Sequence, residues 1–247
     1  MKIQGSDVYN QIASGSRINS AAKDPAGLAI SEKLTSQING NDKAIENIAS
    51  SQDLLNTAEG TLNGITDNLQ RVRDLALQAS NGVLTDSDKT IIQNEIDEIF
   101  KNINNIAQNT EFNTMTLLDG SFQDKNLAAN NQGQGSVMQL ENSSLQALGL
   151  DGFSVEGDFD IQQIDDALSK VQESRSEIGA KTNGFDSQIR QTEVARENLT
   201  SARSTLADLD ISKAISDLNK EKVLNQYKLS VQNLQAEQEK NQLGILL

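Results

Sequence analysis

The sequence predicts a mainly α-helical fold: a long antiparallel helical bundle or coiled coil with a small β-hairpin region, plus a terminal-helix inner domain. Three observations lead to this prediction. The chain of 247 residues contains one proline, Pro25, and proline is the residue that most strongly interrupts helices. Its apolar side chains are mostly Leu, Ile and Ala with charged residues between them, as in coiled coils. They recur every three or four residues, which is the spacing of one helix face.

The first predicted helix carries a heptad repeat between residues 48 and 79. Apolar residues fill the a and d positions of about four heptads. These residues are Ile48, Leu55, Leu62, Leu69 and Ala76, interleaved with Ala58, Ile65, Val72 and Ala79. The helix is expected to end at Asn81-Gly82, because this dipeptide is typical of turns.

A second helix is predicted to begin near Thr85 or Asp86. The carboxylates of Asp86 and Asp88 are favourably placed against the positive end of its dipole. The segment 105–113 is expected to end it. Its apolar stripe consists of Ile92, Ile96, Ile99, Ile103 and Ile106.

The middle of the chain, residues 112–160, changes character. Gly and Asn clusters such as Asp119-Gly120 and Asn130-Asn131 signal turns. Short apolar runs at 115–118 and 137–140 predict strands, as hairpins packed on the helices.

Helix resumes near Ile161 with the most regular pattern in the chain. Its seam matches those of the N-terminal helices, which favours an antiparallel bundle that brings the two termini together. A generic coiled-coil scaffold would explain the heptads equally well. The residues seven apart are Ile164, Val171, Ile178, Phe185, Thr192, Leu199 and Leu206, with Leu168, Ile189, Ala195, Ala202 and Leu209 as a second row.

The last segment, from about Ile211, is apolar up to the C-terminal residues. Spacings of three and four predict a stripe along one side of a helix. An extended helix at a chain end has few ways to cover such a stripe, so the pattern indicates a subunit of a larger assembly. The residues expected to mediate self-assembly are Ile215, Leu218, Leu224, Tyr227, Val231, Leu234, Ile245 and Leu246.

Composition excludes several functions. The chain has neither cysteine nor histidine, so disulfides, thiolate metal sites and the commonest general base are absent. Its net charge of −14 repels phosphate groups, so neither nucleic acid nor an anionic membrane is an expected partner. The N-terminal residues lack the apolar region of a signal peptide, and no apolar run is long enough to span a bilayer.

Candidate chemistry is sparse. Asp158, Asp160, Asp165 and Asp166 form the densest acidic cluster, but they lack the spacing of a calcium loop. A solvated helix N-terminus explains the cluster better. Serine is plentiful, but the usual catalytic triad also needs histidine. A catalytic Ser–Lys pair is formally possible, but no pattern in the sequence supports one. We therefore expect no enzyme, no cofactor and no metal.

Several motifs resemble those of one family. Residues 14–33, SGSRINSAAKDPAGLAISEK, are similar to the N-terminal signature of bacterial flagellins. Further similar segments follow in the same order and span nearly the whole chain. They are Thr57 to Gly60, Leu69 to Ala76, Thr110 to Asn113, Leu148 to Leu150, Ala202 to Ser204 and Val231 to Leu247.

The resemblance implies a structural subunit of the extracellular flagellar filament, which polymerises with copies of itself and serves motility. Flagellins are exported unprocessed by the flagellar type III apparatus, with an export chaperone on the C-terminal segment. The family fold implies an inner domain of residues 1–20 with 211–247 and an outer helical bundle of residues 21–210, including the irregular segment 112–160. The short middle indicates a minimal form without variable outer domains.

The resemblance also implies a receptor surface. The contacts of the animal flagellin-sensing Toll-like receptor fall on Arg71, Leu75 and Glu95. Arg71 and Glu95 are equally compatible with an ordinary solvated surface that carries a weak ion pair.

The chain also departs from the family pattern. Few residues precede Ser14, where flagellins usually have a longer helix, Ser16 replaces a usual leucine, and Pro25 lies in the turn. These departures leave an alternative open: a secreted flagellin-like protein that does not form normal filaments.

Overall fold

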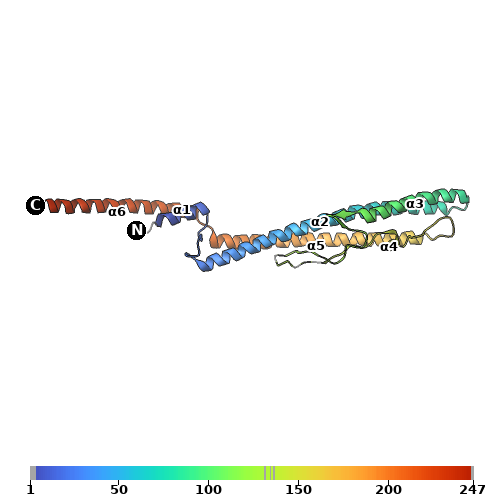
Figure 1. The fold of residues 1–247 in the computed structure, drawn as a ribbon, viewed down its shortest axis with the longest axis horizontal. Helices are drawn as coiled ribbons and strands as arrows, with labels where there is room; N and C mark the ends of the chain where they lie inside the picture. The colour runs from blue at the N-terminus through green and yellow to red at the C-terminus, as the bar shows by residue number, and fades with distance from the viewer. Residues whose placement is uncertain (1–3, 131, 134, 136, 246–247) are drawn as a thin grey trace. The chain divides into compact units, whose positions relative to one another are not determined.

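The computed structural model describes residues 4–130, 132–133, 135 and 137–245 (Figure 1). The chain divides into two compact units, Met1–Ile38 with Glu197–Leu247, and Asn39–Arg196. This division falls at other residues than the predicted division into 1–20 with 211–247 and 21–210, which stays a prediction. Almost all regular structure is helical, as the sequence predicts.

The seam of helix α2 (Pro25–Ala79) is buried along its whole predicted length. All nine apolar seam residues named above, from Ile48 to Ala79, expose at most 1 % of their surface. The heptad prediction is therefore confirmed. Burial of a Leu or Ile side chain contributes about 1.5–3 kcal/mol, so this seam makes a large contribution to the stability of the Asn39–Arg196 unit.

Helix α3 (Asp86–Asn109) begins where the sequence predicts. Thr85 is its N-cap: the Thr85 hydroxyl accepts from the Asp88 N–H, and the Asp88 carboxylate accepts from the Thr85 N–H at 2.9 Å. This capping box satisfies two backbone donors that the first turn leaves unpaired. The buried side of α3 includes Ile96 and Ile103.

Helix α5 (Gln162–Ala207) follows its predicted seam only in part. Ile164, Val171, Ile178 and Phe185 are buried, whereas the later members of the series are half-buried. The heptad pattern thus continues beyond the part of α5 that packs into the core of the Asn39–Arg196 unit.

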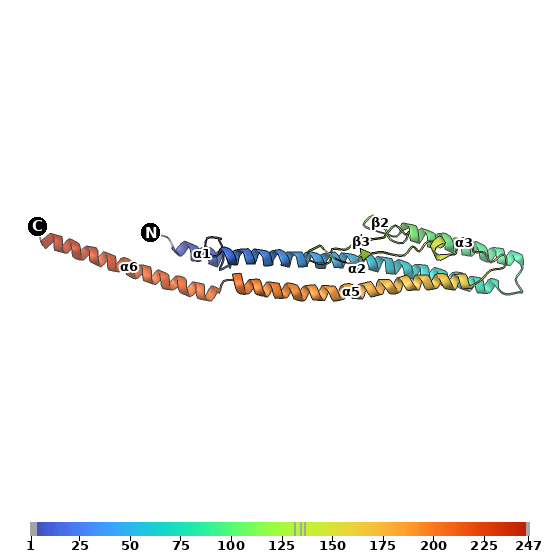
Figure 2. The same cartoon turned by 90° about the horizontal axis from the view of Figure 1, so that it is seen from below.

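Within that unit α2 and α5 run antiparallel (Figure 2). Arginine–carboxylate pairs connect them at three heights, in the order Asp42 with Arg196, Glu59 with Arg175, and Arg73 with Asp165. Residue numbers rise along α2 as they fall along α5, which confirms the predicted antiparallel arrangement.

The middle segment forms two short antiparallel hairpins. Strand β1 (Glu111–Phe112) pairs with β2 (Met115–Thr116), and β3 (Lys125–Asn126) pairs with β4 (Val137–Met138). The strands are shorter than the apolar runs that predict them, because the rest of each run packs into the core: Leu117, Leu118 and Leu140 are buried. A four-residue helix α4 (Leu145–Leu148) follows.

The turn between β1 and β2 consists of Asn113 and Thr114, and both have positive φ, 49° and 63°. Two such residues match the twist of a two-residue hairpin. Asn adopts this region readily, whereas a β-branched residue such as Thr rarely does.

The segment before α5 is held against α3 by one buried amide. Gln93 Oε1 accepts from the Val155 N–H at 2.8 Å, and Gln93 Nε2 donates to the Asp97 carboxylate at 2.7 Å. Phe153 lies between Phe100 and Phe159, with edge-to-face ring centroids 6.2 and 6.1 Å apart. Such pairs add to the stabilisation that apolar burial gives.

In the other unit α1 (Gln4–Ser14) lies beside the first part of α6 (Ile211–Ile245) (Figure 1). The chain after α1 pairs antiparallel with the chain before α6: Arg17 N–H donates to Ala207 O at 2.7 Å, and Leu209 N–H donates to Gly15 O at 3.0 Å. Pro25 is the first residue of α2, where its missing N–H costs nothing. The Asp24 carboxylate accepts from the Gly27 N–H at 2.8 Å and caps this helix.

The cap of α3 can be tested with Thr85→Ala. We expect the free energy of unfolding at neutral pH to fall by about 1 kcal/mol, because the substitution removes the capping hydroxyl. In the folded protein the pKa of Asp88 is lowered, first by the hydrogen bond from the Thr85 hydroxyl and then by the one from the Thr85 N–H. A lowered pKa stabilises the fold above the ordinary aspartate pKa, and this contribution is lost as pH falls through the lowered value.

The difference between Thr85→Ala and the parent should therefore shrink in acid, as measured by urea unfolding at a series of pH values. Thr61→Ala is the matched control, because the Thr61 hydroxyl donates only to the Thr57 carbonyl. A Thr85→Ala difference that stays constant with pH would contradict the assigned role of Asp88.

Candidate functional site

Helix α6 carries apolar residues on two different faces. At 3.6 residues per turn, Ala214, Ile215 and Leu218 share one side of the helix. The next four predicted assembly residues lie about half a turn away from it. We call these residues the distal face; it consists of Leu224, Tyr227, Val231 and Leu234. The predicted single stripe is therefore wrong, because a shift of the pattern between 218 and 224 moves it to the opposite side.

The first face is covered within the chain. Ala214 and Leu218 are each 8 % exposed, and α1 packs against this part of α6. The Lys222 Nζ lies 5.5 Å from the centre of the Tyr9 ring, a cation–π contact between the same two helices. α1 has 11 residues and α6 has 35, so α1 can lie against at most about a third of α6 at 1.5 Å per residue.

The distal face is exposed. Leu224, Tyr227 and Leu234 expose 48, 67 and 60 % of their surfaces, and Val231 is half-buried. Ile215 is also exposed, at 44 %, but it lies at the edge of the first face and not on the distal face. Large apolar side chains gathered in this way mark interaction surfaces, since single soluble chains rarely leave them uncovered.

The two most C-terminal predicted assembly residues lie beyond the described part of this surface. Ile245 is the last residue of α6, and Leu246 lies outside the described residues. Val223 and Leu229, which the sequence analysis did not select, are also exposed, at 63 and 55 %. A helical projection of 211–245 would have found both.

The predicted receptor residues fall into two environments. Arg71 Nη2 and Nε donate to Glu95 Oε1 at 2.6 and 3.0 Å, and these side chains are 56 and 47 % exposed. Leu75 is 2 % exposed and belongs to the core. The surface available at this place is therefore the Arg71–Glu95 pair, and the receptor contact stays a prediction.

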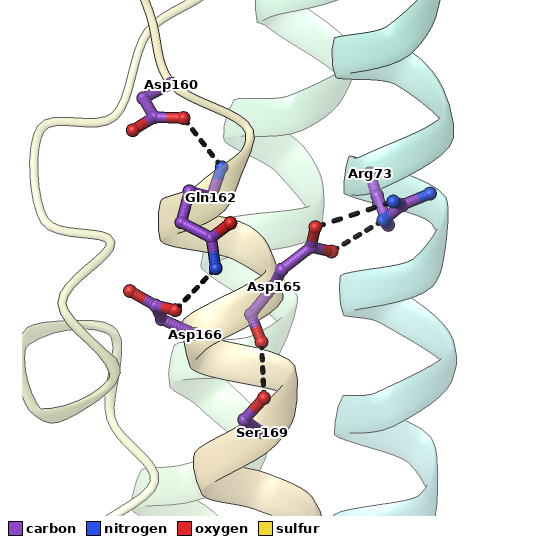
Figure 3. A network of polar contacts seen from close by, with 6 residues as sticks. All are labelled: Arg73, Asp160, Gln162, Asp165, Asp166 and Ser169. Carbon is purple, nitrogen blue, oxygen red and sulfur yellow. Dashed lines mark hydrogen bonds and ion pairs between the residues drawn. The ribbon is translucent and has the colours of Figure 1, made fainter.

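Three aspartates of the acidic cluster at the start of α5, namely Asp160, Asp165 and Asp166, have protein partners (Figure 3). The Asp160 carboxylate accepts from the Gln162 N–H at 2.9 Å, and the Asp166 carboxylate accepts from the Gln162 amide at 2.9 Å. Asp165 pairs with Arg73, whose Nε donates at 2.6 Å, and this hydrogen bond is the main cause that raises the pKa of Arg73. The arrangement is that of a helix N-terminus, as the sequence analysis preferred.

The acidic side chains in the described part of the chain do not gather into a metal centre. No group of three or more acidic side chains among those residues is arranged to hold a metal ion. A surface hollow of about 350 Å³ is lined by Glu141, Lys170, Glu173 and Glu177, but Lys170 Nζ already donates to the carbonyls of Ala147 and Leu148 at 2.9 and 3.2 Å. Within those same residues no helix is both long and apolar enough to cross a membrane. The fold and the exposed face of α6 thus define a helical structural protein.

Comparison with known proteins identifies the family. Residues 2–123 match the family model of the bacterial flagellin N-terminal helical region, and residues 161–245 match that of the C-terminal helical region. The chain belongs to the bacterial flagellin family.

Relatives of similar length support this assignment. A flagellin of Halalkalibacterium halodurans is 35 % identical over 90 % of this chain and 85 % of the relative. The flagellar filament 30.7 kDa core protein of Treponema maltophilum is 31 % identical over 99 and 92 %, and a flagellin of Bacillus subtilis is 33 % identical over 96 and 90 %. A solved Vibrio parahaemolyticus structure assigned as a flagellar hook-associated protein has the same fold, with TM-score 0.60, 18 % identity and coverage of 75 % of this chain and 100 % of that one.

The different environments of Leu75 and Arg71 can be tested by alanine substitution. Leu75→Ala should lower the free energy of unfolding by about 2–5 kcal/mol, because it leaves a cavity in a closely packed seam. Arg71→Ala should lower it by less than about 1 kcal/mol, because its ion pair is solvent-exposed. Denaturant unfolding followed by circular dichroism measures both. Equal losses would show that Leu75 is not a core residue.

Proposed function

We propose that this chain is a structural subunit of the bacterial flagellar filament and polymerises with copies of itself outside the cell. Membership of the flagellin family and the filament core proteins among its relatives support the proposal. The observation that carries it is the distal face of α6, which is apolar, exposed and opposite the face that α1 covers.

A helix with two apolar faces suits an open assembly. The first face is used within the chain, so the distal face is free for a different chain. A contact between unlike surfaces of identical subunits repeats without closing when its rotation does not complete a ring, and a helical filament results. Val231 is the least exposed member of the distal face, and its larger neighbours Leu224, Tyr227 and Leu234 offer the contact area.

The proposal includes the division into an inner domain, 1–20 with 211–247, and an outer bundle, 21–210. It also includes export by the flagellar type III apparatus, with a chaperone on the C-terminal segment that contains α6. A chaperone that covers the distal face before assembly would prevent premature association, because exposed apolar helices aggregate. We assign the chain no catalytic role.

Assembly can be tested with Leu234→Ser. We expect the lowest concentration at which seeded filaments grow to rise at least about tenfold, because loss of a buried Leu side chain costs about 1.5–3 kcal/mol. Light scattering and electron microscopy after seeding measure the outcome. Leu229→Ser is the matched control: Leu229 lies on the same helix with a similar exposure of 55 %, but about half a turn from the distal face.

An equal effect of both variants would refute the role of the distal face while leaving filament assembly in place. A parent chain that stays monomeric with seeds would instead support the alternative, a secreted flagellin-like protein that does not form normal filaments.

A second proposed role is recognition by the animal flagellin-sensing Toll-like receptor. Its support is the exposed Arg71–Glu95 pair, which presents both charges on neighbouring helices α2 and α3. Arg71→Ala with Glu95→Ala should abolish receptor binding and leave the helical circular dichroism unchanged. Lys43→Ala with Glu46→Ala is the control, because these two residues form an exposed ion pair elsewhere on α2, with Lys43 Nζ 2.6 Å from Glu46 Oε2. Unchanged affinity of the first double variant in a direct binding assay would refute this role.

A further inference from the structure

Four Asn-Gly dipeptides occur in the chain, at 39–40, 63–64, 81–82 and 183–184. In this dipeptide the backbone nitrogen of Gly can attack the Asn side-chain carbonyl carbon, because Gly has no side chain to hinder the approach. The reaction needs a backbone that can bring the two atoms together and an N–H that is not held in a hydrogen bond. The structure decides which of the four sites meets these conditions.

Asn81-Gly82 meets them. It lies in the connection between α2 and α3 (Figure 2), and both residues are exposed. Asn81 Oδ1 accepts from the Val83 N–H at 3.3 Å, so the Asn81 side chain is folded over the backbone that follows it. Among the described residues the Gly82 N–H donates to no other group, and beyond its chain neighbours no atom lies within 4 Å of the place where a Gly82 Cβ would stand.

The other three dipeptides lie inside long helices. Gly40 and Gly64 belong to α2 and Gly184 belongs to α5, so their N–H groups donate to the carbonyls four residues earlier. Helical φ and ψ also hold the Asn side chain away from the following nitrogen. Asn183-Gly184 is exposed like Asn81-Gly82, so the two sites differ in backbone structure and not in access to water.

We propose that Asn81 is a site of spontaneous deamidation, with Gly82 as the attacking residue and water as the co-reactant. The deprotonated Gly82 nitrogen forms a bond to Asn81 Cγ, and the side-chain amide nitrogen leaves as ammonia. The resulting five-membered succinimide then takes up one water molecule. Opening at one carbonyl gives an ordinary aspartate at this position, and opening at the other gives an isoaspartyl linkage with one extra backbone carbon.

The product changes the charge at the α2–α3 connection. A carboxylate in place of the Asn81 amide stands beside the negative end of the α2 dipole and close in sequence to Asp86 and Asp88. The isoaspartyl form also lengthens the main chain in a turn in which the Leu84 N–H donates to Asn81 O at 3.1 Å. Aged protein is therefore expected to consist of chemically distinct chains that differ at this turn.

The test is incubation of the full chain at mildly alkaline pH, then digestion and mass spectrometry of the peptides that contain each dipeptide. We expect the Asn81 peptide to gain the mass difference between an amide and a carboxylate, with isoaspartate detected by an isoaspartyl methyltransferase. Deamidation at Asn81 should be at least about tenfold faster than at Asn183. The helix around Asn183 must open locally before it can react, and an opening free energy of only about 1.4 kcal/mol already slows a reaction tenfold. The rate should rise with pH, because the attacking nitrogen must lose its proton.

Gly82→Ala should slow the reaction at Asn81 and leave the other sites unchanged, and Asn81→Gln should abolish it. Chain unfolded in urea is the positive control, in which all four sites should react at similar rates. Equal rates at Asn81 and Asn183 in the folded chain would overturn the proposal, and so would an unmodified Asn81 in folded protein when the unfolded chain reacts.

Discussion

The structure depends on the burial of the α2 seam. A helix with about four successive heptads of apolar a and d residues cannot leave this face in water. Helices α3 and α5 and the hairpin segment all contribute buried residues to one core with it. Each exposed ion pair is worth at most about 1 kcal/mol, whereas each buried Leu or Ile is worth about 1.5–3 kcal/mol. The apolar seam therefore decides that the bundle forms.

Polar contacts decide how the bundle is aligned. An apolar seam with a repeat of seven tolerates a slip by one heptad better than polar contacts do, because one apolar residue replaces another at most levels. The arginine–carboxylate pairs between α2 and α5 do not tolerate it, since Arg73, Arg175 and Arg196 each meet a carboxylate in one register only. Gln93 does the same for the segment before α5, because its buried Oε1 accepts a hydrogen bond only when the Val155 N–H lies beside it. Specific register thus comes from contacts that add little stability.

The sequence predicted those features that rest on local rules. Heptad spacing located the seam, and the turn residues and Thr85 located the break between α2 and α3, because periodicity and capping act over a few residues. It did not predict which half of the α5 heptads would be buried, because this burial depends on packing against segments that are distant in the sequence. Leu75 shows the same limit: a family motif placed it among surface contacts, whereas packing against the rest of the bundle buries it. The shift of the α6 stripe is present in the sequence, but intervals of three and four residues do not by themselves keep side chains on one side of a helix; the accumulated angle does.

Under the proposed assembly role, that shift lets one helix serve two purposes. If all apolar residues of α6 lay on one side, the helix α1 and another chain would compete for the same surface, and each would have to displace the other. Placing the distal face about half a turn away removes this competition. Contact within the chain and contact between chains can then exist together, and the first can hold α6 in position before the second forms. A helix ordered in advance loses less conformational entropy on association than one that must order itself then.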